Sequence, residues 1–336
     1  MTIEVFLDDT PGELRAVVER DGRPEHILIE RPDDVPQIRL GARSVARVRQ
    51  SAPGLKGAFV DLGGGQDAFM PIRSGVSAPV GAKVEVEISA ERREAKAPVA
   101  RWLGAGQGEI RLLAAGPTLM QTLAILAPGV EPVTGRDAIE AGWRAVDEAQ
   151  AMGDLAQVER TRAMITVDVD LNAHDMGRAR PRDETNRLAL REAARRIRLN
   201  RWGGLVAVDL IGTQHDGKAI LAALKAAFGD DPAIVHGPVN RFGVLMLSLP
   251  WRRTPLEEIL YADARRRILR PEQAAQEAVR RLRFALLEDT TRARVRLCVA
   301  PGLATAVTPL VAQLGPRAHL KTDDGLRAGD FVVEAE

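Results

Sequence analysis

Two apolar runs that each contain aspartate flank a basic amphipathic segment, and this arrangement constrains the fold more than any other feature of the sequence. The first run is MITVDVDL at 164–171 and the second is LVAVDLI at 205–211. Between them, apolar residues recur at the spacing of one helical face: Leu190, Ala193, Ala194 and Ile197. A helical pattern at 218–228 and a strand-like run at 244–250 follow. Strand, helix, strand, helix, strand predicts an α/β core in which the first two strands are parallel neighbours.

Asp168 and Asp209 lie inside these two apolar strands, where burying an unpaired carboxylate is costly. Neighbouring strand ends bring two carboxylates together, and a divalent cation such as Mg²⁺ relieves their repulsion. A metal held in this way supports water activation and phosphodiester cleavage. The alternative is that each aspartate caps a helix or pairs with a nearby arginine. Asp170 follows Asp168 by two residues, so the two side chains lie on the same face of the strand. Asp170 either orients a metal-bound water there or is a solvated acid at the strand end.

The segment from Arg178 to Trp202 is strongly basic, although the formal net charge of the whole chain is only +1. It contains nine arginines and three acids, so the local balance is 9 − 3 = +6. This predicts a surface that attracts phosphate, or alternatively a solvated helix face.

Short strand-like segments separated by glycine-rich turns begin near Arg39 and predict a small antiparallel barrel. The Gly63-Gly64-Gly65 run indicates a hairpin turn, not a phosphate-binding loop, because no Gly-Lys-Ser follows. Phe59 and Phe69 flank this turn and either stack on RNA bases or belong to the barrel core. The candidate phosphate contacts near them are Lys56, Arg73 and Lys96.

Other segments indicate a mixed α/β chain. We expect strands at 3–7, 14–20 and 26–30, a helix at 139–152, a loop up to Glu159 and a helix at 263–287. A final small unit has strands at 295–300 and 330–335 and a helix at 304–314. Cys298, the single cysteine, is interpreted as a small buried side chain and not as a nucleophile. With no signal peptide or membrane-length apolar run, we expect a cytoplasmic location and no contact with membrane.

Several of these segments together resemble the ribonuclease E/G family. The segments TRAMITVDVDLN, ARRIRLNRWGGLVAVDLIG and VNRFGVLML are similar to its catalytic core, and GLKGAFVDLGGGQDAFMP is similar to its inserted S-one-type RNA-binding barrel. The first 31 residues resemble its ribonuclease H-like start, and the segment from VRLCVAPGLATAV onwards resembles its small C-terminal domain.

The resemblance implies an α/β multi-subdomain fold with a ribonuclease H-like and α/β nuclease-like core, an inserted OB-fold barrel and a small C-terminal α/β domain. The expected ranges are 1–36 for the first ribonuclease H-like part, 37–100 for the barrel, 101–160 for the shortened ribonuclease H-like and 5′-sensor remainder, 161–262 for the catalytic core and 263–336 for the C-terminal domain.

The resemblance also implies roles for individual residues. Asp168 and Asp209, which are 41 positions apart, correspond to Mg²⁺ ligands of an endoribonuclease, and Asp170 adds a third catalytic candidate. The residues implied to bind RNA are Phe59, Phe69, Lys56, Lys96, Arg198, Arg241 and Phe242.

This sequence departs from the family pattern at four places. Asp170 occupies the position of an asparagine, which places an extra negative charge near the phosphate. Leu113 and Ala114 occupy the positions of the Arg-Thr pair that binds a 5′-monophosphate, which predicts weak or absent 5′-end sensing. The region between Gly116 and Asp168 is shortened, and the zinc-sharing cysteines are missing. We therefore expect no zinc and no zinc-linked tetramer, and the sequence is compatible with a homodimer through other surfaces.

The leading hypothesis is a Mg²⁺-dependent endoribonuclease that acts on single-stranded RNA. The first alternative is a catalytically inactive RNA-binding protein on the same scaffold, which the Asp170 change and the missing sensor pair favour. A protein-interaction scaffold without RNA binding is a third possibility.

Overall fold

The computed structural model describes residues 2–72, 77–151, 153, 155–170, 182–212 and 215–335. Arg73, a candidate phosphate contact, and two arginines of the basic segment, Arg178 and Arg180, lie outside the described residues. The chain divides into two compact units. The first consists of Met1–Val146 and Thr254–Glu336, and the second of Asp147–Arg253.

The first unit begins with a three-stranded antiparallel sheet. Its strands are β1 (Ile3–Asp8), β2 (Leu14–Arg20) and β3 (Arg23–Glu30). These confirm the strands predicted from the sequence. Helix α1 (Leu119–Leu126) packs on the sheet through Leu119 and Leu123, which share a buried cluster with Val5 and Val18. Helix α2 (Arg136–Gln150) follows α1 in the chain.

A closed barrel of five strands confirms the predicted barrel. The strands are β4 (Arg43–Ala52), β5 (Gly57–Gly63), β6 (Gln66–Pro71), β7 (Lys83–Ala90) and β8 (Val99–Ala105). They neighbour one another in the order β5-β6-β8-β7-β4, and an additional β4–β5 pairing closes the ring. The β6–β8 pairing is parallel and the other pairings within the ring are antiparallel. A short strand, β9 (Arg111–Ala114), pairs with β4.

Alternation along the strands separates the inside of the barrel from its outer surface. Inward side chains such as Val60 and Met70 are fully buried in one apolar cluster. The hairpin between β5 and β6 turns at the predicted glycines, where Gly63, Gly64 and Gly65 all have positive φ angles, of 84°, 62° and 77°. Side chains with a Cβ rarely adopt this conformation, which explains the glycine run.

The C-terminal part of the first unit is a small α/β assembly. Its elements are α5 (Leu256–Leu260), β15 (Tyr261–Asp263), β16 (Ile268–Leu269), α6 (Pro271–Glu288), β17 (Val295–Val299), α7 (Pro301–Val311), β18 (Ala318–Thr322) and β19 (Phe331–Ala335). The sheet order is β18-β17-β19, with β18 parallel to β17 and β19 antiparallel to it. One face of this sheet is buried against α6 and α7.

Two sequence expectations for this part have clear outcomes. The helix predicted from residue 263 is wrong over its first residues, because β15 and β16 form a hairpin there and the helix begins at Pro271. Proline is favoured in the first helical turn because it has no N–H to leave unpaired. Cys298 is only 2% exposed, and burial raises the pKa of its thiol, so it is a small, buried and unreactive side chain as expected.

A buried network of charges binds α6 to the first two strands. Arg280 Nε donates to Asp8 Oδ2 at 2.6 Å, and its Nη2 donates to Glu13 Oε1 at 2.8 Å. Arg15 and Arg31 also donate to Glu13. Each buried carboxylate therefore has charged partners, as the low-dielectric interior requires.

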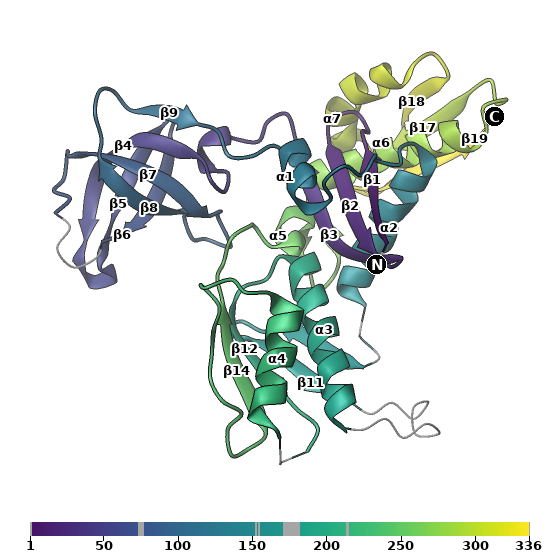
Figure 1. Ribbon diagram of the computed structural model, residues 1–336. Helices are drawn as coiled ribbons and strands as arrows, with labels where there is room; N and C mark the ends of the chain where they lie inside the picture. The colour runs from purple at the N-terminus through teal and green to yellow at the C-terminus, as the bar shows by residue number, and fades with distance from the viewer. Residues whose placement is uncertain are drawn as a thin grey trace. The chain divides into compact units, whose positions relative to one another are not determined.

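The second unit is a five-stranded sheet covered on one face by two helices. The strand order is β10 (Ala156–Arg160), β11 (Ile165–Val169), β12 (Gly204–Asp209), β14 (Val244–Leu249) and β13 (Val235–His236). Helices α3 (Arg182–Asn200) and α4 (Gly217–Phe228) cover the same face, as Figure 1 shows. The predicted parallel pairing of β11 with β12 is confirmed.

Residues 156–159, predicted to be part of a loop, belong to the edge strand β10, which pairs antiparallel with β11. This edge strand is stabilised by backbone pairing more than by apolar burial. Its sequence, which includes the polar residues Gln157 and Glu159, therefore lacks the apolar run that would predict a strand. The described residues also form the short 3₁₀ helices η1 (Pro36–Ile38), η2 (Pro53–Leu55) and η3 (Ala312–Leu314). None of the helices in the described part of the chain combines the length and apolarity needed to cross a lipid bilayer.

Candidate active site

Asp168 and Asp209 are direct register partners in the parallel strands β11 and β12. Their neighbours Val167 and Val208 are buried beneath α3 and α4, so alternation places both aspartates on the opposite face of the sheet. Adjacent strands lie about 4.8 Å apart, which brings the two side chains side by side. The expectation that both carboxylates meet at neighbouring strand ends is therefore confirmed.

The expectation that these carboxylates are buried is wrong, because both side chains are exposed. The two runs look uniformly apolar in sequence, but the helices cover only one face of the sheet. The desolvation cost that would demand a partner for each acid is therefore absent. Their proximity to each other still favours a cation between them.

Asp170 follows directly after the end of β11 and is exposed. Its backbone N–H donates to the carbonyl of Leu155 at 3.3 Å, which continues the pairing with the chain before β10. Asp170 therefore lies at the same end of the sheet as Asp168 and Asp209, with its carboxylate available to solvent.

Asn186 positions the segment that follows Asp209. It is fully buried on α3, its Nδ2 donates to the carbonyl of Ile211 at 3.1 Å, and its Oδ1 accepts from the Ile211 N–H at 3.0 Å. The sequence reasoning missed this residue. The available signal was a polar side chain on the apolar stripe of α3, four residues before Leu190.

The turn before β14 brings Arg241 and Phe242 to the same end of the sheet, because Val244 pairs with Asp209. The Asn240 side chain accepts from the backbone N–H groups of Phe242 and Val244 at 2.9 Å and 3.1 Å, which holds the turn. Arg241 lies over the Phe242 ring, 4.8 Å from its centroid, and Phe242 is 69% exposed. The turn thus presents a cation and an aromatic face beside the acidic pair.

Gly243 allows the turn before β14 to pack closely against the segment that follows Asp209. Its φ is +83°, and a Cβ added there would lie 3.2 Å from the carbonyl oxygen of Gly212. The turn therefore packs against the segment that leaves Asp209, and a side chain at this position would separate them.

The oxygen donors at this end of the sheet fit a hard divalent cation whose coordination shell is completed by water and substrate. Asp168 and Asp209 supply carboxylate oxygens, and Mg²⁺ is commonly held by one or two carboxylates together with waters and phosphate oxygens. Within the described residues, no three histidine, cysteine, aspartate or glutamate side chains form a group that could hold a metal ion. The pair therefore fits a partly open site and not an all-protein cage.

Comparison with known proteins identifies the segment that carries these residues. Residues 150–249 match the model of the Ribonuclease E/G family. This segment belongs to the ribonuclease E/G family. The match includes both aspartates and the Arg241–Phe242 turn, and it indicates an endoribonuclease or RNA-processing function. No curated protein matches the chain.

Several arginines of the ribonuclease E/G segment have structural partners. Arg198 Nη1 donates to the carbonyl of Ala227 at 2.7 Å, which joins the carboxyl end of α3 to the end of α4. Arg195 and Arg196 are buried and pair with Glu192, and Arg195 also pairs with Glu148. Because α3 returns from β11 to the start of β12, Arg198 lies at the end of the unit opposite the aspartates. The structure does not bring it into the site.

The barrel, which lies outside the matched ribonuclease E/G segment, presents the predicted aromatic pair on its outer surface. Phe59 and Phe69 are register partners on β5 and β6, and their ring centroids lie 5.5 Å apart in an edge-to-face arrangement. Both are partly exposed, whereas their strand neighbours Val60 and Met70 are buried. Alternation therefore excludes both rings from the core, which leaves them accessible for stacking.

The two lysines predicted to bind phosphate on the barrel, Lys56 and Lys96, are both exposed. Lys56 ends η2 with a φ of 51°, and Lys96 lies in the loop between β7 and β8. Phe69 pairs with Val99, so the Lys96 loop leads into the strand beside the aromatic pair. Neither lysine forms an ion pair with another described residue, which leaves both charges available to a phosphate.

Proposed function

We propose that this protein is a Mg²⁺-dependent endoribonuclease that cleaves single-stranded RNA. The observation that carries the proposal is the register pairing of Asp168 with Asp209 on an exposed sheet face, inside a segment of the ribonuclease E/G family. A phosphodiester linkage can approach this face because both carboxylates are open to solvent.

The proposed roles follow from the chemistry of each side chain. Asp168 and Asp209 would hold the Mg²⁺ ion, which, when bound, supplies Lewis acidity to the phosphate and to water. Asp170, which accepts but does not donate hydrogen bonds when ionised, orients the attacking water. Arg241 attracts the phosphate, and Phe242 provides a surface on which a base near the cut can stack.

We propose that the five-stranded barrel is an OB-fold that holds the RNA strand. If β4 to β8 are numbered one to five, their neighbour order around the ring is 1-2-3-5-4-1, with the third and fifth strands parallel. This order is consistent with a five-stranded Greek-key barrel. Phe59 and Phe69 stack bases, and Lys56 and Lys96 neutralise phosphates.

Cleavage is proposed to be independent of a 5′-monophosphate. Leu113 and Ala114 on β9 occupy the positions of the family's phosphate-binding pair, and Leu113 is 41% exposed. Apolar side chains offer neither charge nor hydrogen bonds to a phosphate. Matched RNAs with 5′-monophosphate and 5′-hydroxyl ends should therefore be cut at equal rates.

The decisive experiment measures cleavage of an A/U-rich single-stranded RNA labelled with a fluorophore and a quencher, during a Mg²⁺ titration. We expect Mg²⁺-dependent cleavage by the wild type and a loss of at least a hundredfold in Asp168→Asn and Asp209→Asn. RNA affinity, measured by anisotropy in EDTA, should remain within about threefold. Asp230→Asn is the matched control, because Asp230 is an exposed acid of the same unit that pairs with Lys225 at 3.7 Å.

One observation favours a second candidate function, a non-catalytic RNA-binding protein. Asp170 adds a third carboxylate at the end of the sheet where the RNA phosphate would lie, and its negative charge repels the phosphate. In that case the wild type would bind RNA in a salt-sensitive way without cleaving it in Mg²⁺ or Mn²⁺, and the aspartate variants would bind equally well.

A further inference from the structure

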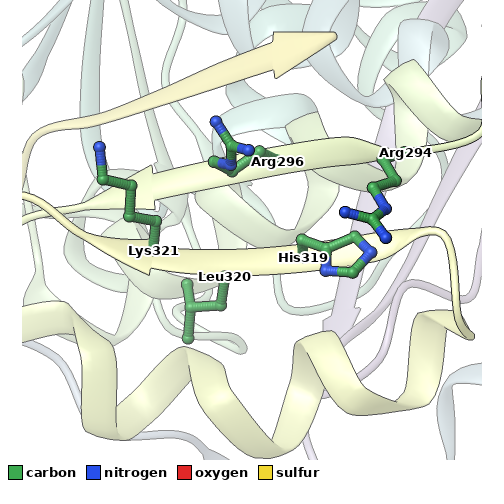
Figure 2. A pocket seen from close by; sticks show the side chains of 5 residues that line it. All are labelled: Arg294, Arg296, His319, Leu320 and Lys321. Atoms are coloured by element: carbon green, nitrogen blue, oxygen red, sulfur yellow. The ribbon is translucent and has the colours of Figure 1, made fainter. Parts of the chain in front are cut away.

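The outer face of the C-terminal sheet carries a cationic hollow that the proposed active site and barrel do not use. The hollow has a volume of about 440 Å³ and is lined by Arg294, Arg296, His319, Leu320 and Lys321. Arg296 lies on β17 and Arg294 directly precedes this strand, whereas the other lining residues lie on the adjacent strand β18 (Figure 2). Leu320 extends toward the helix side of the sheet, whereas Arg296 and Lys321 extend to the other side.

Register explains why the four polar side chains among these residues, Arg294, Arg296, His319 and Lys321, gather on one face. Arg296 pairs with His319, and Cys298 pairs with Lys321, so β17 and β18 run parallel with matched alternation. Val295 and Leu297 are buried against the helices, and the residues between and before them face outward. Local alternation and parallel pairing together therefore build a ladder of polar side chains across two strands.

The charge of this face is positive. Glu334 on β19 pairs with Arg296 at 3.4 Å and offsets one cation. Arg294 and Lys321 are exposed and form no ion pair with another described residue, so two positive charges and the His319 ring remain to attract an anion. The hollow is therefore complementary to an anion that can approach from solvent.

We propose that this face binds the phosphate backbone of single-stranded RNA, an inference that rests on the proposed function. Outward residues along one strand recur every ~6.6 Å, an interval similar to that between successive phosphates of an extended strand. No phenylalanine, tyrosine or tryptophan is among the residues that line the hollow, so bases are not stacked between rings there. Binding at this face is accordingly independent of sequence and sensitive to salt.

The test measures the affinity of the full chain for fluorescein-labelled single strands of oligo-U, oligo-A and mixed sequence, by anisotropy in EDTA across a salt series. The variant is R294E/K321E, and the matched control is R265E/R327E. Arg265 and Arg327 are exposed residues of the same part of the chain that lie outside its helices and strands, and the control makes the same change in net charge. Thermal melting confirms that all proteins fold, and R294Q/K321Q provides a milder second variant.

We expect R294E/K321E to bind all three strands roughly tenfold more weakly or worse, with the salt slope reduced by about 1.4, or about 0.7 for each cation removed. The control should stay within about threefold, and R294Q/K321Q should lie between. If R294E/K321E and R265E/R327E bind alike while the wild type binds RNA, this inference is overturned and the proposed function stands. If the wild type binds none of the strands, both are overturned.

Discussion

Arg280 and Asp8 are 272 positions apart in sequence, yet Arg280 Nε donates to Asp8 Oδ2 at 2.6 Å inside the first unit. Burial lowers the pKa of Arg280, but the carboxylates of Glu13 and Asp8 outweigh this effect and raise that pKa above its ordinary value. The guanidinium is therefore charged at every accessible pH, and it joins α6 to β1 and to the start of β2.

Replacing Arg280 with leucine should destabilise the protein by about 3–5 kcal/mol, because Asp8 and Glu13 would lose a buried cation. Urea unfolding followed by circular dichroism measures the change. Arg265→Leu, at an exposed turn position, should shift the free energy of unfolding by no more than about 0.5 kcal/mol. Equal effects of the two substitutions would show that the buried network contributes nothing.

Glu13 should make stability fall in acid. Burial raises the pKa of Glu13, but Arg15, Arg280 and Arg31 outweigh burial and lower this pKa from 4.5 to about 2. A depressed folded-state pKa stabilises the protein above the unfolded-state value, and the stabilisation is lost as pH falls through the folded-state value. We expect a loss of roughly 3 kcal/mol between about pH 4.5 and pH 2.

Glu13→Gln is the matched comparison for this pH dependence. Its free energy of unfolding should vary less than that of the wild type over the same window, as measured by urea unfolding at several pH values. Parallel curves for the two proteins would assign the acid sensitivity to other carboxylates.

Asn186→Leu should lower stability and slow cleavage together. The substitution leaves the partly buried N–H and carbonyl of Ile211 without their partner, at a cost of about 1–3 kcal/mol. It also loosens the segment directly after Asp209. Lys225→Met, at an exposed ion pair on α4, should change the free energy of unfolding by less than about 1 kcal/mol. Unchanged kcat in a destabilised Asn186→Leu protein would separate the packing role from the site.

Replacing Phe59 and Phe69 with leucine should weaken RNA binding about tenfold for each ring, because stacking on an aromatic ring contributes roughly 1–3 kcal/mol per base. Anisotropy in EDTA measures the affinity, and thermal melting checks the barrel. Val80→Ala, an exposed apolar residue of the same region, should leave affinity unchanged. Retained affinity in the double variant would remove the aromatic pair from the RNA path.

Asp170→Asn should lower the KM for RNA by roughly two- to threefold, because it removes one negative charge at the site edge. The asparagine keeps an oxygen that accepts a hydrogen bond, so kcat should be maintained. Steady-state cleavage at fixed Mg²⁺ measures both constants. A fall in kcat of a hundredfold would instead assign proton transfer to the Asp170 carboxylate.

Local patterns in the sequence determined the strand–helix–strand crossover and the parallel neighbours that bring Asp168 to Asp209. They also determined the glycine hairpin and the barrel strands. These features depend on residues close in sequence, whose periods of 2 and 3.6 decide which elements form. The edge strand β10 and the β15–β16 hairpin escaped prediction, because strands this short are stabilised by pairing with a neighbour more than by a pattern of their own.

Only the tertiary structure decided which face of the sheet holds the two aspartates. An apolar run shows no inside or outside until α3 and α4 cover one of its faces. The same reason applies to Asn186 with Ile211, to Arg280 with Asp8 and to the cationic face of β17 and β18. Each depends on contacts between residues that are distant in sequence, and the energy of such contacts comes from burial and register that no local period records.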